Sequence, residues 1–149
     1  MSIQKEITQK MKEAMKSKDT VALTALRALK SAFMLANTEA RDGELTDQEE
    51  LKIVQKQVKQ RKDSAVVFSE QGRTDLAEPE LAEAEILEQF LPEALSEEEI
   101  EKVVIDIIAN IGAEGMKDMG KVMGMASKQL AGSADGKTIS AIVKNKLSN

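Results

Sequence analysis

Six lysines near the carboxyl end of the chain form the pattern that most clearly predicts a binding function. After residue 115 they are opposed only by Asp118 and Asp135, so this end carries a net charge of +4 in a chain of net charge −5. The six are Lys117, Lys121, Lys128, Lys137, Lys144 and Lys146. A basic face of this kind can contact phosphate groups, and the alternative is a solvated helix surface.

Two glycines and one turn belong to the same basic segment. Gly120 and Gly124 are four residues apart, which opens a patch on one side of a helix. We favour close helix packing as its purpose, and close approach of an RNA backbone is the alternative hypothesis. Residues 135–138 (DGKT) begin a last helix, whose N-terminus is a second place for an anion. They do not form a phosphate-binding P-loop, because the motif's first glycine is one residue out of register.

The chain contains no histidine and no cysteine, which removes most ordinary catalytic designs. Ser–His and Cys–His pairs, imidazole ligands and thiolate zinc sites are all excluded. A Ser–Lys pair, acid–base work by carboxylates and an all-oxygen Mg²⁺ site remain. Residues 74–101 contain eleven acids and no base, but without the spacing of a calcium-binding loop. We therefore expect no metal and no cofactor, and we interpret this acidic stretch as a solvated face that repels nucleic acid.

A second group of bases precedes the acidic stretch and predicts a secondary basic face. Its members are Lys56, Lys59, Arg61, Lys62 and Arg73. Arg61 interrupts an otherwise apolar helical stripe, which indicates a paired or snorkelling side chain. We expect Arg61 to join two helices through an ion network, with a ligand site as the alternative. The other expected members of the network are Asp63, Arg73 and Asp75.

The elements that must position these side chains are helices. Apolar residues recur with a helical period along the chain, and strong helix formers are interrupted by only two prolines. The predicted helices cover residues 3–15, 20–40, 47–71, 77–91, 97–111, 119–130 and 139–147. Asp19, Thr46 and Ser96 are predicted N-caps, the last two within capping boxes. The fourth helix is expected to start at residues 76–78, because Pro79 is tolerated only in a first turn.

The sequence predicts an all-α protein of roughly seven helices in two parts. Pro92 ends one helix just before Ser96 begins another, so the expected parts are a helical subdomain of residues 1–93 and a three-helix bundle of residues 94–149. No apolar run is long enough to cross a bilayer, and no signal-peptide core is present. We expect a cytoplasmic monomer that binds neither membranes nor DNA.

Several motifs together resemble the GatB/YqeY tail-domain family. The segment GKVMGMASKQLAGSADGKTISAIVKNKL, residues 120–147, is similar to the end of that domain, and LRALKSA, residues 26–32, is similar to its second helix. The combination of QRKDSA, GR-x-DLA, FLPEALSEEE and GKVMG in this order resembles free-standing YqeY-like proteins. Pro79 stands where a charged residue is expected in the family pattern.

The resemblance implies a fold and a partner. It implies a helical N-terminal part, a three-helix C-terminal part, and kinship with the tail of the B subunit of glutamine-dependent aspartyl/glutamyl-tRNA amidotransferase, which helps to hold the tRNA body. It also implies association with carbon–nitrogen ligase activity that uses glutamine as amido-N-donor. The chain has neither an amidase Ser–Lys signature nor an ATP site, so we expect it to be non-catalytic by itself.

Three functions are compatible with these observations. The first is a tRNA-binding or tRNA-linked accessory protein of translation, in which the six lysines, Gly120 and Gly124 contact RNA. The second is a helical module that docks on amidotransferase or synthetase components, through the acidic fourth helix and a methionine-rich surface. The third is an enzyme that works through carboxylates, which ranks last because no nucleophile–base pair can be drawn.

Overall fold

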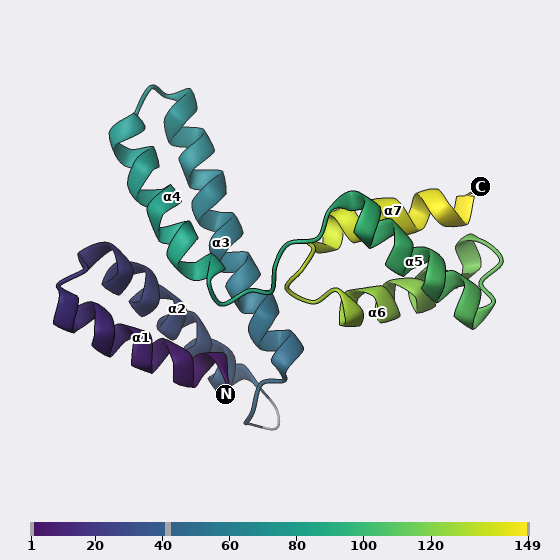
Figure 1. The fold of residues 1–149 in the computed structure, drawn as a ribbon, viewed down its shortest axis with the longest axis horizontal. Coiled ribbons are helices and arrows are strands. Elements are labelled where there is room, and N and C mark those ends of the chain that lie inside the picture. The colour runs from purple at the N-terminus through teal and green to yellow at the C-terminus, as the bar shows by residue number, and fades with distance from the viewer. Residues whose placement is uncertain (1, 41–42, 149) are drawn as a thin grey trace. The chain divides into compact units, whose positions relative to one another are not determined.

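The computed structural model describes residues 2–40 and 43–148, and these residues form an all-α fold. Seven α-helices and one short 3₁₀ helix lie within these ranges, and no β-strand does (Figure 1). The predicted fold class is thereby confirmed. Among these residues, no helix combines the length and apolar character needed to cross a bilayer. The chain divides into two compact units, Met1–Leu91 and Pro92–Asn149.

The N-terminal unit consists of two helical hairpins. Helices α1 (Ile3–Ser17) and α2 (Thr20–Glu39) form the first, and α3 (Asp47–Glu70) and α4 (Thr74–Glu88) form the second (Figure 1). Helix α2 contacts α1, α3 and α4, as its broad apolar face predicts. The shared core is made of buried side chains, including Ile7, Leu26, Leu29, Phe33, Val54, Val58 and Leu87.

Short-range hydrogen bonds fix where the helices of this unit begin and end. The Asp19 carboxylate accepts a hydrogen bond from the Ala22 backbone N–H at 3.0 Å, which caps α2. Thr46 and Glu49 form the predicted capping box at the start of α3. Gly72 takes a φ of +72° in the turn from α3 to α4, a conformation that glycine adopts at little cost. The predicted Asp19 cap and Thr46 capping box are confirmed, because each depends on residues close together in the sequence.

The predicted start of the fourth helix is wrong. Helix α4 begins at Thr74, so Pro79 is its sixth residue and lies inside the helix. Proline has no N–H, and the carbonyl of Asp75 therefore lacks its intrahelical donor. Asp75 and Pro79 are both exposed, so water can satisfy that carbonyl. Packing of the buried Ala77 and Ala84 against α3 holds the helix together across the proline.

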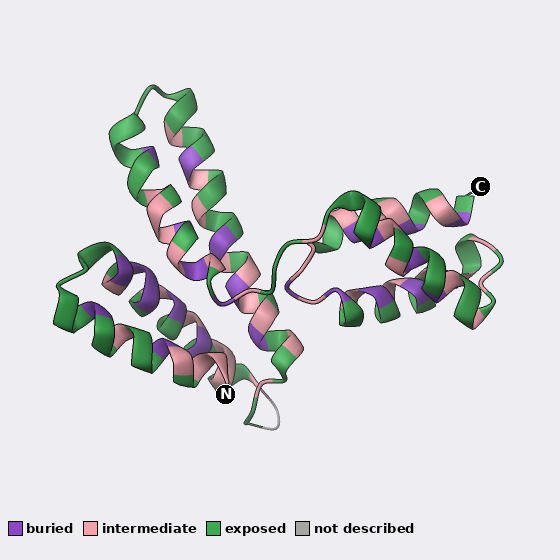
Figure 2. Ribbon diagram, in the orientation of Figure 1, coloured by how far each residue is buried: buried purple, intermediate pink, exposed green. Residues whose placement is uncertain are grey.

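The C-terminal unit is a three-helix bundle. It contains α5 (Glu97–Ile111), the 3₁₀ helix η1 (Met116–Asp118), α6 (Met119–Gln129) and α7 (Gly136–Ser148). Each helix buries one stripe and exposes the other side (Figure 2). The buried stripes are Ile100, Val104 and Ile107 from α5, Val122 and Ala126 from α6, and Ile139, Val143 and Leu147 from α7. Ser96 and Glu99 form the second predicted capping box.

Candidate nucleic-acid interface

The helices of the C-terminal unit carry opposite charges. Helix α5 contains five acids and one lysine, a net charge of −4. The segment from Met119 to Ser148, which includes α6 and α7, contains five lysines and one aspartate, a net charge of +4. An anionic polymer that approaches this unit is attracted to α6 and α7 and repelled by α5.

The exposed side of α6 presents two lysines and two glycines. Lys121, Lys128, Gly120 and Gly124 are all exposed, on the side of the helix opposite to the buried Val122 and Ala126. A Cβ atom added at either glycine would meet no atom within 4 Å. The interpretation that these glycines serve helix packing is therefore wrong. Val122 and Ala126, which have the same four-residue spacing, make the packing contacts, and the glycines leave the helix backbone open to a partner.

We expect Gly124→Ala to stabilise the C-terminal unit, because the glycine is in the interior of α6 and its surroundings are empty. The gain should be about 0.5–1 kcal/mol, since alanine loses less conformational entropy than glycine when a helix forms. Thermal unfolding monitored by the methyl NMR signals of Val122 and Val143 should show a midpoint about 3–6 °C higher. A lower midpoint would mean that Gly124 does pack against another part of the chain.

Lys117 and Lys146 both take part in ion pairs, but they differ in how accessible they are to a phosphate. Lys117 lies in η1 and its Nζ atom is 3.5 Å from Glu114, but both side chains are more than 70% exposed. Such an exposed pair is weak and competes poorly with a phosphate. The Lys146 ammonium pairs with Glu101 of α5, and only 29% of its side chain is exposed. Lys146 therefore links α7 to α5 and is the least accessible of the six lysines.

Helix α7 exposes two further lysines, and an aspartate caps its N-terminus. Lys137 and Lys144 are exposed. The Asp135 carboxylate accepts a hydrogen bond from the Thr138 backbone N–H at 2.6 Å. An anion at this helix start would have to approach the Asp135 carboxylate, which already holds one backbone N–H, so the cap disfavours the predicted anion site.

Four of the five bases of the predicted secondary basic face are in ion pairs. Lys59 pairs with Asp63 at 2.6 Å, Lys62 with Glu88, and Arg73 with Asp75 at 2.9 Å. Arg61 pairs with Glu83 at 3.2 Å. Lys56 is exposed and is in no ion pair within residues 2–40 and 43–148. Only the Arg61 pair is mostly buried, so Arg61 is the base of this face least available to a phosphate, whereas the three exposed pairs are weak.

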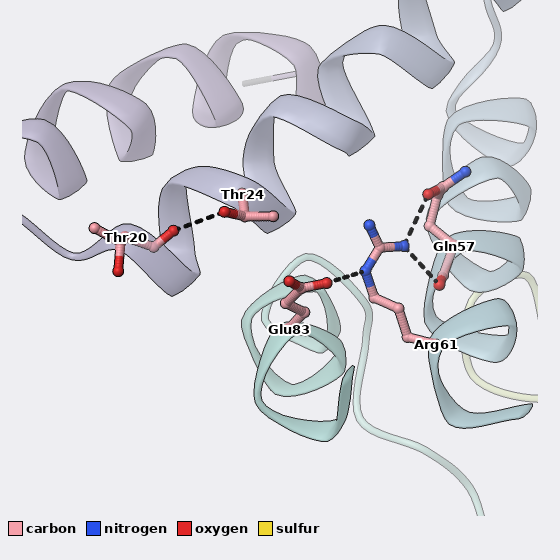
Figure 3. A network of polar contacts seen from close by, with 5 residues as sticks. All are labelled: Thr20, Thr24, Gln57, Arg61 and Glu83. Carbon is pink, nitrogen blue, oxygen red and sulfur yellow. Dashed lines mark hydrogen bonds and ion pairs between the residues drawn. The ribbon is translucent and has the colours of Figure 1, made fainter. Parts of the chain in front are cut away.

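Arg61 joins α3 to α4, as predicted, but through a partner that the sequence did not indicate. Its Nε atom donates to Glu83 at 3.2 Å, and its Nη1 atom donates to the Gln57 backbone carbonyl at 3.1 Å and to the Gln57 side chain at 2.9 Å (Figure 3). The predicted partners Asp63 and Asp75 pair locally instead. Glu83 was missed because it is one of many acids in residues 74–101, and no local pattern distinguishes it.

The Arg73–Asp75 pair is a local feature of the turn before α4. Arg73 Nε and Nη2 donate to the two Asp75 carboxylate oxygens at 3.0 and 2.9 Å. These bonds lower the pKa of Asp75 and raise the pKa of Arg73. Both groups lie at the surface, so the pair contributes little to stability. Across the described ranges, no group of three or more acidic side chains is placed to hold a metal ion.

A family model described as "Yqey-like protein" matches residues 4–147. The chain belongs to the Yqey-like protein family. The match extends over both units and reaches every α-helix of the described residues, which confirms the family resemblance seen in the sequence motifs. Two kinds of protein stand out among the curated relatives of this Yqey-like chain.

The first kind of relative is named for mitochondria. The chain is 41% identical over 96 residues to "Altered inheritance of mitochondria protein 41, mitochondrial" of Clavispora lusitaniae, covering 62% of this chain and 55% of that protein. It is 31% identical over 126 residues to the protein of the same name from Pyrenophora tritici-repentis, covering 83% and 68%. The Yqey-like chain thus spans between half and about two thirds of these relatives.

The second kind of relative belongs to a glutamyl-tRNA(Gln) amidotransferase. The chain is 38% identical over 73 residues to one subunit of this amidotransferase from Thermococcus gammatolerans. The match covers 46% of this chain but only 12% of that much longer protein. The similarity therefore relates this Yqey-like chain to one part of an amidotransferase subunit and does not extend to the rest of that protein.

The predicted cytoplasmic location is contradicted by the first group of relatives. Their names place them in mitochondria. The prediction rested on the lack of an apolar signal-peptide core, and that argument does not bear on mitochondrial import. Transit peptides are amphipathic and rich in arginine, so hydropathy does not detect them.

Proposed function

We propose that this chain is a tRNA-binding accessory protein related to glutamine-dependent tRNA amidotransferase, and that it is non-catalytic by itself. The observation that carries the proposal is the separation of charge in the C-terminal unit, with +4 on the segment that includes α6 and α7 and −4 on α5. The similarity to a part of a glutamyl-tRNA(Gln) amidotransferase subunit supports tRNA as the anionic partner.

The centre of the proposed contact is the exposed side of α6. Lys121 and Lys128 lie on either side of Gly124, where the helix backbone is uncovered. A phosphodiester backbone can approach such a surface closely while the two ammonium groups neutralise neighbouring phosphates. The basic surface is extended by Lys117, Lys137 and Lys144. Lys146 contributes less, because its ammonium group pairs with Glu101 of α5.

The proposed binding depends on charge and shape and not on base recognition. The chain has three phenylalanines and no tyrosine or tryptophan. Phe33 and Phe90 are buried, and Phe68 is partly buried, all within the N-terminal unit. Base stacking on the basic surface therefore has no aromatic platform, and contacts to phosphate and sugar are the remaining mode for a folded RNA.

The proposal of a non-catalytic role rests on the amino acid inventory. Neither histidine nor cysteine is available as a base or nucleophile. Carboxylates and lysines remain, but the sequence contains no amidase Ser–Lys signature. Carbon–nitrogen ligase activity would thus be supplied by other proteins or domains, while this chain holds the RNA.

A second candidate function is docking on protein components of translation, such as an amidotransferase or a synthetase. It is favoured by α4, which contains six acids and no base. Within the described ranges, only Glu83 and Glu88 of the six form ion pairs with α3. The other acids leave α4 with a negative surface, and a basic partner protein would be complementary to it.

The two candidates differ in their response to salt. We expect bulk tRNA to bind the full chain at low ionic strength, with fluorescence anisotropy as the measurement. Three or four phosphate contacts predict a slope of about −3 in a plot of log affinity against log salt concentration. Absence of binding at low salt, where electrostatic attraction is strongest, would contradict the RNA proposal and leave protein docking as the better explanation.

A further inference from the structure

A groove between α1 and α2 has an apolar floor and is lined by lysines from both helices. The floor is formed by Ile7, Phe33 and Met34, and the lysines are Lys5 of α1 and Lys30 of α2. Ile7 and Phe33 are almost completely buried members of the core. Met34 is 61% exposed, so the apolar floor extends from the core to the surface.

The charge around this groove is positive. Residues 3–39, which span α1 and α2, contain seven bases and four acids, a net charge of +3. Lys10 and Glu13 form an ion pair in this hairpin, but neither residue lines the groove. Lys5 and Lys30 are exposed, and no ion pair involves either of them in the part of the chain that the structure describes.

The size and lining of the groove define what it can hold. Its volume is about 220 Å³. That volume is below the roughly 300–1,000 Å³ of typical small-molecule sites, so it suits one or two side chains of a docked segment better than a whole cofactor. An apolar floor also favours an apolar side chain over a phosphate, which keeps its hydration. RNA is therefore a poor occupant, although lysines are present.

We propose that this groove docks an acidic amphipathic helix of another protein. Apolar side chains of the helix would cover Met34 and fill the groove above Ile7 and Phe33. Carboxylates on either side of its apolar stripe would pair with Lys5 and Lys30. This mode of recognition, an amphipathic helix laid in an apolar groove, draws its affinity from the buried side chains and its selectivity from the charges.

The proposal can be tested with a designed probe and the full-length chain. The probe is a fluorescein-labelled helical peptide. Its leucines are spaced alternately three and four residues apart, and all its other residues are glutamates. The control peptide has the same leucines and lysines in place of the glutamates. We expect the acidic peptide to bind with a dissociation constant below about 1 mM in low salt, and the basic peptide not to bind.

Substitutions in the chain locate the binding site. The double variant Lys5→Glu/Lys30→Glu should weaken binding of the acidic peptide at least about ten-fold, and Met34→Ser should weaken it roughly five-fold. Two matched controls lie on α1 outside the groove. Lys12→Glu/Lys16→Glu reverses two exposed charges, as Lys5→Glu/Lys30→Glu does, and Met15→Ser changes a methionine that is 59% exposed, similar to Met34. Both controls should bind the acidic peptide like the unmodified chain.

Three outcomes would overturn the proposal. The first is no binding of the acidic peptide by the unmodified chain. The second is an equal loss of affinity in the groove variants and the two α1 controls, because the attraction would then come from overall charge. The third is displacement of the peptide by tRNA in the unmodified chain together with loss of tRNA binding in Lys5→Glu/Lys30→Glu, which would assign the groove to RNA. Far-UV circular dichroism confirms that each variant is folded.

Discussion

Arg61→Met is expected to destabilise the N-terminal unit by about 2–3 kcal/mol. The Arg61 and Glu83 side chains are only 11% and 17% exposed. Removal of the guanidinium would leave the Glu83 carboxylate largely desolvated without its cation, and Gln57 without its donor. The estimate lies below the roughly 3–5 kcal/mol seen for fully buried pairs, because some solvent reaches both groups.

The chain offers a matched control for this substitution. Arg73→Met removes the same side chain from the same hairpin, but the Arg73 and Asp75 side chains are 53% and 65% exposed. Its effect should be close to zero, because water solvates both groups whether or not they are paired. The double variant Arg61→Met/Glu83→Leu should recover most of the stability lost in Arg61→Met, since no unpaired charge remains.

Urea unfolding can be measured for the N-terminal unit alone. All three phenylalanines, Phe33, Phe68 and Phe90, lie in this unit, so phenylalanine fluorescence reports on its unfolding. Equal destabilisation by Arg61→Met and Arg73→Met would contradict the proposed importance of burial. A double variant as unstable as Arg61→Met would show that the arginine acts through packing and not through its charge.

Reversal of the two α6 lysines is expected to have the largest effect on tRNA binding. Lys121→Glu/Lys128→Glu replaces two attractions with two repulsions at the centre of the proposed surface. The affinity for bulk tRNA should fall at least about ten-fold at low salt, and the slope against log salt concentration should flatten by about 2. The measurement is the anisotropy titration with bulk tRNA, repeated over a range of salt concentrations.

A control with the same change in net charge separates a local effect from a global one. Lys12→Glu/Lys16→Glu alters two exposed lysines of α1, which belongs to the other unit. This control should lose much less affinity, because Lys12 and Lys16 are not part of the proposed contact surface and their substitution acts on tRNA only through the overall charge. If both double variants bind tRNA equally weakly, overall charge and not the α6 surface governs the interaction.

Features that depend on neighbouring residues could be predicted from the sequence without any knowledge of the fold. Asp19, Thr46 and Ser96 begin helices because each side chain accepts a hydrogen bond from a backbone N–H three residues later. The apolar periods correctly predicted the seven α-helices of the described residues, although not the residue at which α4 begins. Such interactions span about one helical turn, and a linear pattern contains them completely.

The partner that each side chain meets became known only from the packing of the helices. Arg61 pairs with Glu83, 22 residues away, and Lys146 pairs with Glu101 across the bundle. Gly120 and Gly124 have the spacing of a packing motif, yet they face away from the core because the Val122 stripe is more apolar. The period of the apolar residues shows that a helix has an apolar side and a polar side. Which side another helix covers, and which acid reaches a given base, depends on contacts between residues far apart in the chain.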